Sequence, residues 1–243
     1  METAVWAGLY GVYLMIRSLA IDDSGAAFAH AAWLIDLERN AGLLHEVRLQ
    51  AVVGSLGASS GFFDLYYMIG FGPLLVVSLT WLGLRRRAAY RELRTALLAS
   101  LALASFFFVL YPTAPPRLVS DLGIADTVGL SGHDTGSIAG IDFNPYAAMP
   151  SMHVGWSLLL AMVAWRVVDR ALPRVLIALH PVLMTLTVVV TGNHFFVDAV
   201  AGAAVALAGY ALVSCRSARI FLRVRPARAR GRGSGRCLAA PGA

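Results

Sequence analysis

The chain has 243 residues, of which 58% are hydrophobic and 14% charged, and its mean hydropathy is +0.68. A soluble domain carries roughly a quarter charged residues, so this composition excludes an ordinary soluble protein and indicates an integral membrane protein. The net charge of +6 comes largely from arginines near the C-terminal end, and it gives no reason to expect a nucleic-acid partner.

Six apolar segments have the length of membrane-spanning helices, which need roughly 20 residues each. Arg17 interrupts the end of the first segment, and only Gly192 and Asn193 separate the fifth from the sixth. The segments are residues 3–19, 62–84, 95–111, 151–168, 175–191 and 194–214. The sequence therefore predicts an all-α, polytopic membrane protein, a six-transmembrane-helix bundle in one domain over residues 1–215.

Two segments outside the spans differ in composition. Residues 21–60 mix charged side chains with apolar ones at roughly helical spacing, which predicts amphipathic surface helices between the first and second spans. Residues 216–243 are rich in Arg, Gly and Ala without apolar periodicity, which predicts a disordered cytoplasmic tail. In the 21–60 segment, the apolar stripe consists of Leu34, Leu37, Leu44, Val47 and Ala51.

Arginine clusters orient the predicted bundle. They occur at residues 85–94, 166–174 and from 216 onward, and all fall on one side if six spans alternate. Positively charged loops face the cytoplasm. We therefore expect an integral protein of a bacterial plasma membrane with N- and C-termini in the cytoplasm. Loops 112–150 and 192–193 then face the outer side together with the 21–60 segment.

Two polar motifs flank the long loop of residues 113–149. Arg117 follows three prolines after the third span, and a guanidinium there can hold a phosphate through two parallel hydrogen bonds, or only extend toward lipid headgroups. Ser151 is a good N-cap at the start of the fourth span. The free backbone amides at the start of that helix suit an anion. His153, in the first turn, can exchange a proton with a substrate, although an incidental surface histidine is the alternative interpretation.

The third motif is at the start of the sixth span. His194 and Asp198 are four residues apart, which places them on one helix face, and a carboxylate in an apolar span needs a partner. Asp198 can fix the tautomer of His194 and leave the other ring nitrogen free to attack, or the two can form a purely structural pair. Near these motifs, the possible pocket residues are Asn193, Tyr111, Trp156 and Asp64.

A metal ion is the alternative to an anion as the ligand of these motifs. His153, His194 and Asp198 are residue types that can bind one, but the capped helix start and the nearby Arg117 favour an anion.

At these three motifs the sequence resembles the type-2 phosphatidic acid phosphatase superfamily, over most of residues 30–214. It is most similar to the branch of inositol phosphorylceramide synthases, which are inositolphosphotransferases, and their bacterial relatives. The resemblance implies a six-helix membrane core that uses neither a metal nor a cofactor. It implies that His194 is the nucleophile, that Asp198 orients it, and that His153 transfers protons. Arg117, Ser151 and the amide of Met152 would hold the phosphoryl oxygens.

The sequence departs from the phosphatase members at several positions. The chain has no Lys for the first motif, and Met152 stands where the second motif usually has Gly. Thr187 and Val188 stand where the third motif has Ser-Arg, so one phosphate-binding arginine is missing unless Arg17, Arg39 or Arg48 replaces it. These losses favour the synthase-like branch, in which an alcohol rather than water accepts the phosphoryl group.

Three functions are compatible with these motifs. The first is a membrane phosphotransferase or phosphatase that acts on a lipid phosphoester through a phospho-histidine and passes the phospho-headgroup to an alcohol or to water. A simple lipid phosphate phosphatase is the closest variant of it. The second is a non-catalytic lipid-headgroup binder or small transporter, and the third is a structural bundle with a histidine–aspartate clasp. The first uses all three motifs, because attack on phosphorus needs a nucleophile, an acid for the leaving group and charge neutralisation.

Overall fold

A computed structural model describes residues 11, 24–56, 59–130, 137–138, 141–142 and 145–224. Apart from Gly11, the predicted first span of residues 3–19 lies outside the described residues, as does the tail beyond residue 224. The described chain is helical apart from loops and one two-residue antiparallel pair, β1 (Ser137–Ile138) with β2 (Ile141–Asp142), which confirms the all-α class.

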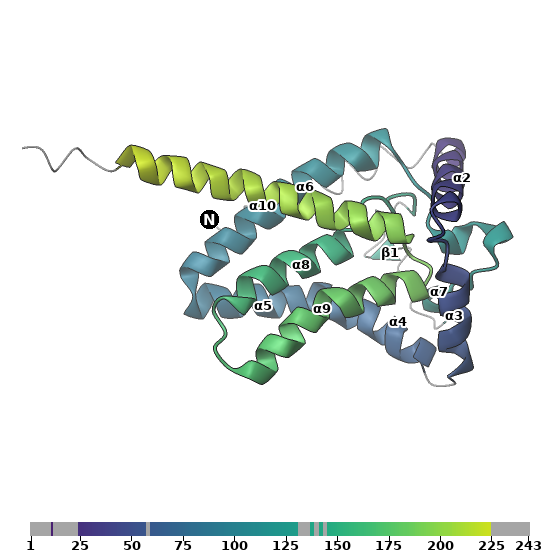
Figure 1. The fold of residues 1–243 in the computed structure, drawn as a ribbon, viewed down its shortest axis with the longest axis horizontal. Coiled ribbons are helices and arrows are strands. Elements are labelled where there is room, and N and C mark those ends of the chain that lie inside the picture. The colour runs from purple at the N-terminus through teal and green to yellow at the C-terminus, as the bar shows by residue number, and fades with distance from the viewer. Residues whose placement is uncertain are drawn as a thin grey trace, which may run out of the picture.

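The described helices follow in chain order (Figure 1). They are α2 (Ser24–Asn40), α3 (Glu46–Ser55), α4 (Ser59–Gly70), α5 (Gly72–Arg85), α6 (Arg87–Leu110), α7 (Thr127–Leu130), α8 (Met152–Trp165), α9 (Ala171–Val190) and α10 (Phe196–Val224). Two 3₁₀ helices, η1 (Pro116–Leu118) and η2 (Ser120–Leu122), shape the start of the long loop.

Four segments in the described part are long and apolar enough to cross a membrane. They are Gly61–Arg85, Arg87–Leu110, Ala171–Val190 and Phe196–Ser214, and they correspond to the second, third, fifth and sixth predicted spans. The first of them consists of α4 and α5, which are separate helices because the backbone breaks at Phe71, just before Pro73. Six spans are therefore not confirmed.

The fourth predicted span forms a shorter helix than expected. We predicted residues 151–168, but α8 has 14 residues, so it is roughly 21 Å long at 1.5 Å per residue, against about 30 Å of hydrocarbon. Eight of its residues are buried, among them Leu159 and Val163. α8 lies inside the bundle between α6, α9 and α10. Its apolar residues therefore belong to the protein core and do not indicate contact with lipid.

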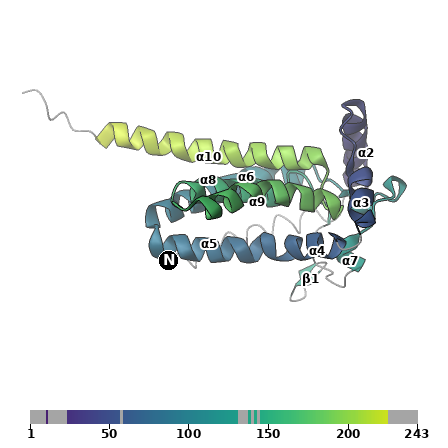
Figure 2. The ribbon, with the colours of Figure 1, turned by 60° about the horizontal axis from the view of Figure 1, so that its bottom comes forward.

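α2 and α3 lie across one end of the bundle, nearly at right angles to the long helices (Figures 1 and 2). This position agrees with the predicted surface helices, but only part of the predicted apolar stripe is buried. Leu34 is buried, whereas Leu37 and Val47 are 40% and 42% exposed. Glu38 and Glu46 are buried instead, each with no exposed surface.

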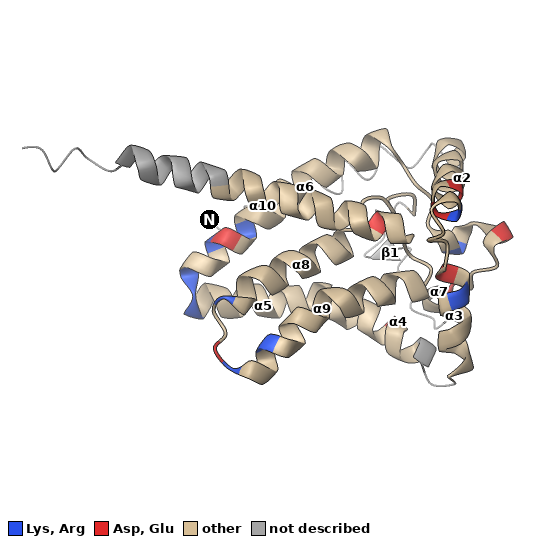
Figure 3. Cartoon of the chain, viewed as in Figure 1, with Lys and Arg blue, Asp and Glu red and all other residues tan. Residues whose placement is uncertain are grey.

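The two ends of the bundle differ in charge. The arginines of the α5–α6 and α8–α9 links lie at the end opposite to α2 and α3 (Figure 3). At this same end lies the C-terminal part of α10, whose assigned range reaches Val224. The disordered tail over residues 216–243 stays a prediction.

α8 and α10 approach each other until their backbones are in contact. A Cβ atom at Gly202 of α10 would lie 2.0 Å from the Ser151 carbonyl oxygen, and one at Gly155 of α8 would lie 2.5 Å from the Gly202 carbonyl oxygen. The Ser151 amide also donates to the Asp198 carbonyl at 2.9 Å. The starts of the two helices are therefore joined by main-chain contacts, and both carry predicted site residues.

Candidate active site

A tight turn between α9 and α10 places His194. The amide of Gly192 donates to the Val189 carbonyl and that of Asn193 to the Val188 carbonyl, each at 3.0 Å, which is the Schellman pattern of a helix C-terminus. Gly192 has φ +69°, and a Cβ there would lie 2.7 Å from the Ile124 side chain. Only glycine fits both conditions, so this link can be as short as the sequence shows.

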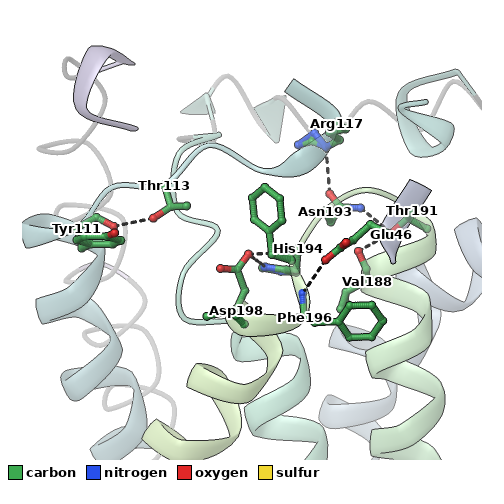
Figure 4. Close-up of polar contacts among 12 residues, drawn as sticks. Glu46, Tyr111, Thr113, Arg117, Val188, Thr191, Asn193, His194, Phe196 and Asp198 are labelled. Carbon is green, nitrogen blue, oxygen red and sulfur yellow. Dashed lines mark hydrogen bonds and ion pairs between the residues drawn. The ribbon is translucent and has the colours of Figure 1, made fainter. Parts of the chain in front are cut away.

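His194 and Asp198 meet at the start of α10, as predicted (Figure 4). The His194 Nδ1 is 3.6 Å from Asp198 Oδ2, and the two side chains are 7% and 0% exposed. Asp198 Oδ2 also accepts the Phe195 amide at 2.9 Å, so the carboxylate caps its own helix. The distance to Nδ1 is longer than a hydrogen bond, and a shift of about 0.6 Å brings it into range.

His153 faces His194 from the first turn of α8. The two ring centroids are 5.6 Å apart. On another side, His153 lies against the rings of Tyr67 and Phe71, with centroids at 4.8 and 4.2 Å. The histidines of two separate motifs therefore lie next to each other, and aromatic packing limits how far the ring of His153 can turn.

Ser151 occupies the predicted N-cap position of α8, but its side chain makes no capping hydrogen bond. The residue is fully buried, and its Oγ has no hydrogen-bond partner within the described residues. Met152 is the first residue of the helix, where backbone amides have no intrahelical acceptor. A buried hydroxyl beside the start of a helix can donate to an anion.

Arg117 is held beside the His194 turn, although 76 residues separate it from Asn193. Its amide donates to the Gly192 carbonyl at 2.9 Å, and its Nε donates to Asn193 Oδ1 at 3.1 Å. Its Nη1 is 3.8 Å from Asp126 Oδ2. The guanidinium is thus fixed on one edge, next to the residue that precedes His194 (Figure 4).

The first amides of α10 are occupied by carboxylates, in contrast to the start of α8. Phe196 donates to Glu46 Oε1 at 3.2 Å and Val197 donates to Glu38 Oε1 at 2.7 Å. An anion therefore fits at the start of α8 rather than of α10. We did not predict either glutamate as a site residue, and the only signal in the sequence was a pair of acidic residues inside an apolar stripe.

The other predicted pocket residues are not all at the site. Tyr111 stacks on His30 with centroids 3.8 Å apart, and burial together with the negative charge of Asp198 raises the pKa of Tyr111. Trp156 stacks on Phe71 and donates to Ser100 Oγ at 3.1 Å. Asp64 accepts the Thr127 hydroxyl at 2.7 Å, so it fastens the long loop to α4.

The missing third-motif arginine has no described substitute. Arg39 forms an exposed ion pair with Asp36 at 2.6 Å, and Arg48 is exposed. Arg17 lies outside the described residues. Val188, at the expected arginine position, is fully buried, and its carbonyl accepts the amides of the His194 turn.

The family comparison agrees with this geometry. A family model for the PAP2 superfamily matches residues 32–212, well over half of the chain. The chain belongs to the PAP2 superfamily. No curated protein and no solved structure matches it significantly. PAP2 superfamily members are phosphatases and phosphotransferases, so membership, together with four apolar helices, indicates a membrane protein with a lipid phosphatase or phosphotransferase type of function.

Proposed function

We propose that this PAP2 protein transfers a phosphoryl-containing group from a lipid phosphoester through a phospho-histidine on His194. The observation that supports this most directly is the 5.6 Å separation of the His153 and His194 rings. A phosphorus atom between two such rings can be attacked from one side while its leaving group is protonated from the other.

In the first step, His194 Nε2 forms a bond to phosphorus as the bond to the leaving oxygen breaks. His153 gives its proton to that oxygen. Asp198 faces the opposite nitrogen, Nδ1, at 3.6 Å, and it stabilises the positive charge that develops on the ring. The substrate draws the pair into hydrogen-bond range.

In the second step, neutral His153 accepts a proton from water or an alcohol. The oxygen of that acceptor forms a bond to phosphorus as the bond to Nε2 breaks, and both histidines return to their starting state. Arg117, the Ser151 hydroxyl and the Met152 amide hold the phosphoryl oxygens in both steps. We propose that the protein belongs to the inositol phosphorylceramide synthase-like branch, because Thr187 and Val188 stand where the phosphatases have a Ser-Arg pair.

The test uses purified protein in detergent with EDTA present and a panel of lipid phosphoesters. Inositol, glycerol and water are compared as acceptors, and both phosphate release and headgroup exchange are measured. A labelled intermediate that is acid-labile and base-stable supports the phospho-histidine. A protein that binds these lipids without turnover or labelling is a headgroup binder, and the proposal is then wrong.

Arg117→Lys should lower kcat/KM by about 10²-fold, because lysine keeps the charge but loses the second parallel hydrogen bond and the Asn193 contact. Steady-state kinetics with the best donor lipid measure this. Arg39→Lys is the matched control, since Arg39 is exposed and paired only with Asp36 in the described chain. Equal kinetics for both variants would remove Arg117 from the phosphate site.

We also propose that the site opens to the outer side of the membrane and that the arginine-rich end is cytoplasmic. A cysteine at Leu56 or at Leu172, both 70% exposed, is introduced into a chain without Cys215 and Cys237. An impermeant maleimide should label position 56 in intact cells and position 172 only after permeabilisation. The reverse pattern would invert the orientation.

A further inference from the structure

Two glutamates from different helices meet under the first turn of α10. Glu38 of α2 and Glu46 of α3 are each fully buried. One oxygen of each accepts an α10 amide, from Val197 for Glu38 and from Phe196 for Glu46. The second oxygen of each, Oε2, is buried and receives no hydrogen bond from any N–H or O–H group of the described chain.

Two ionised carboxylates cannot satisfy each other, because both are only acceptors. Each also repels the other, and the charged Asp198 lies at the same helix start and acts on Glu38. A carboxylic acid, in contrast, donates to a neighbouring carboxylate. One proton on the pair therefore supplies the missing donor and removes one of two buried charges.

We propose that Glu38 and Glu46 hold one proton between them and that this pair fixes the first turn of α10, and with it His194 and Asp198. Both glutamates are positioning residues for the reaction, and their catalytic consequence rests on the function proposed above. The shared proton itself does not depend on that function.

The electrostatic surroundings agree with this arrangement. Burial, the hydrogen bond that a proton on Glu38 makes with Glu46, and the negative charges of Glu46 and Asp198 raise the pKa of Glu38 from about 4.5 to about 9, although the Val197 amide opposes the shift. Asp198 in turn faces His194. The nearby basic groups at the adjoining ends of α2 and α3 are Arg39, His45 and Arg48, and all three are exposed. The pair thus keeps its proton at neutral pH.

The sign of the pH effect follows from this shift. Below about pH 4.5 Glu38 is protonated in both folded and unfolded chains, and its contribution to stability is fully present. Between about 4.5 and about 9 the unfolded chain releases the proton while the folded chain keeps it, so stability falls as pH rises. Above that range the effect is constant.

Glu38→Gln is the decisive variant, because its amide oxygen can accept the Val197 amide while its NH₂ donates to Glu46 permanently. The melting temperature of the wild type should fall as pH rises from about 5 to about 9, and that of Glu38→Gln should fall clearly less. Glu38→Ala, which loses the bond to Val197, should melt lower at every pH. Equal pH slopes for wild type and Glu38→Gln would overturn the proposal.

Infrared spectroscopy tests the proton without any substrate. The wild type at neutral pH should show the carbonyl stretch of a buried protonated carboxyl group, and Glu38→Gln and Glu46→Gln should each lack it. A wild type without this band would show two ionised glutamates, and the shared proton would be refuted even if the protein is a phosphotransferase.

The positioning role of the glutamate pair is tested separately, by kinetics. The kcat of the wild type should fall as pH rises through about 9, and Glu38→Gln should lack this loss. If the infrared and melting results hold while kcat has the same alkaline loss in both proteins, the pair is structural only and its positioning role is wrong.

Discussion

His194→Ala should lower turnover of the best lipid donor by about 10⁴-fold or more and abolish the acid-labile phosphoprotein, because the variant has no nitrogen to attack phosphorus. His153→Ala should also be slow, but it keeps the nucleophile. With a donor whose leaving group needs no proton, it should still form the labelled intermediate. Single-turnover labelling with a radioactive donor separates these two losses.

His45→Ala is the control for this pair, because His45 is exposed and makes no capping hydrogen bond to α3. It should keep wild-type turnover and wild-type labelling. Full activity in His194→Ala, with a melting temperature equal to that of the wild type, would eliminate the proposed nucleophile.

Gly202→Ala should be the most damaging change outside the candidate site residues. The added Cβ would lie 2.0 Å from the Ser151 carbonyl oxygen and 3.0 Å from the Ser151 nitrogen, both of them backbone atoms. The helices must separate, which should cost about 1–3 kcal/mol of stability and, through misplacement of the two histidines, about 10²-fold in kcat. Thermal melting and kinetics are measured on the same preparation.

Gly54→Ala makes the same chemical change in another helix. A Cβ at Gly54 would meet nothing within 4 Å in α3, so alanine should be neutral or should stabilise the helix by about 0.5–1 kcal/mol. If Gly202→Ala behaves like Gly54→Ala, the close approach of α8 and α10 does not determine the geometry of the site.

The sequence alone predicted the long helices and the convergence of the motifs. Apolar length defined four of the spans, because lipid-facing helices are apolar along their whole exposed surface. The loop ends came together as expected. Thr113 donates to the Tyr146 carbonyl at 2.6 Å, which joins the first motif to the second across the long loop. His153 and His194 therefore lie side by side, as their positions at two helix starts suggested.

Features that depend on tertiary burial could not be predicted. In the sequence, Glu38 and Glu46 look like residues of a solvent-exposed helix face. They are buried because α2 and α3 dock onto the start of α10, where both glutamates accept backbone amides. The length of α8 was overestimated for a related reason, because an apolar run has the same appearance in lipid and in protein core. The missing arginine of the third motif leaves no pattern from which a replacement could be found.

The close crossing of α8 and α10 affects which positions of the protein can change during evolution. Because Gly155 and Gly202 bring main chain against main chain, the spacing of the two imidazoles does not depend on the side chains that cover the outside of the bundle. Val200 and Leu212, which are 69% and 60% exposed on α10, can change among apolar types as membranes of different lipid composition require. The spacing of the two histidines and the adaptation to a particular bilayer thereby depend on separate positions of the same helix.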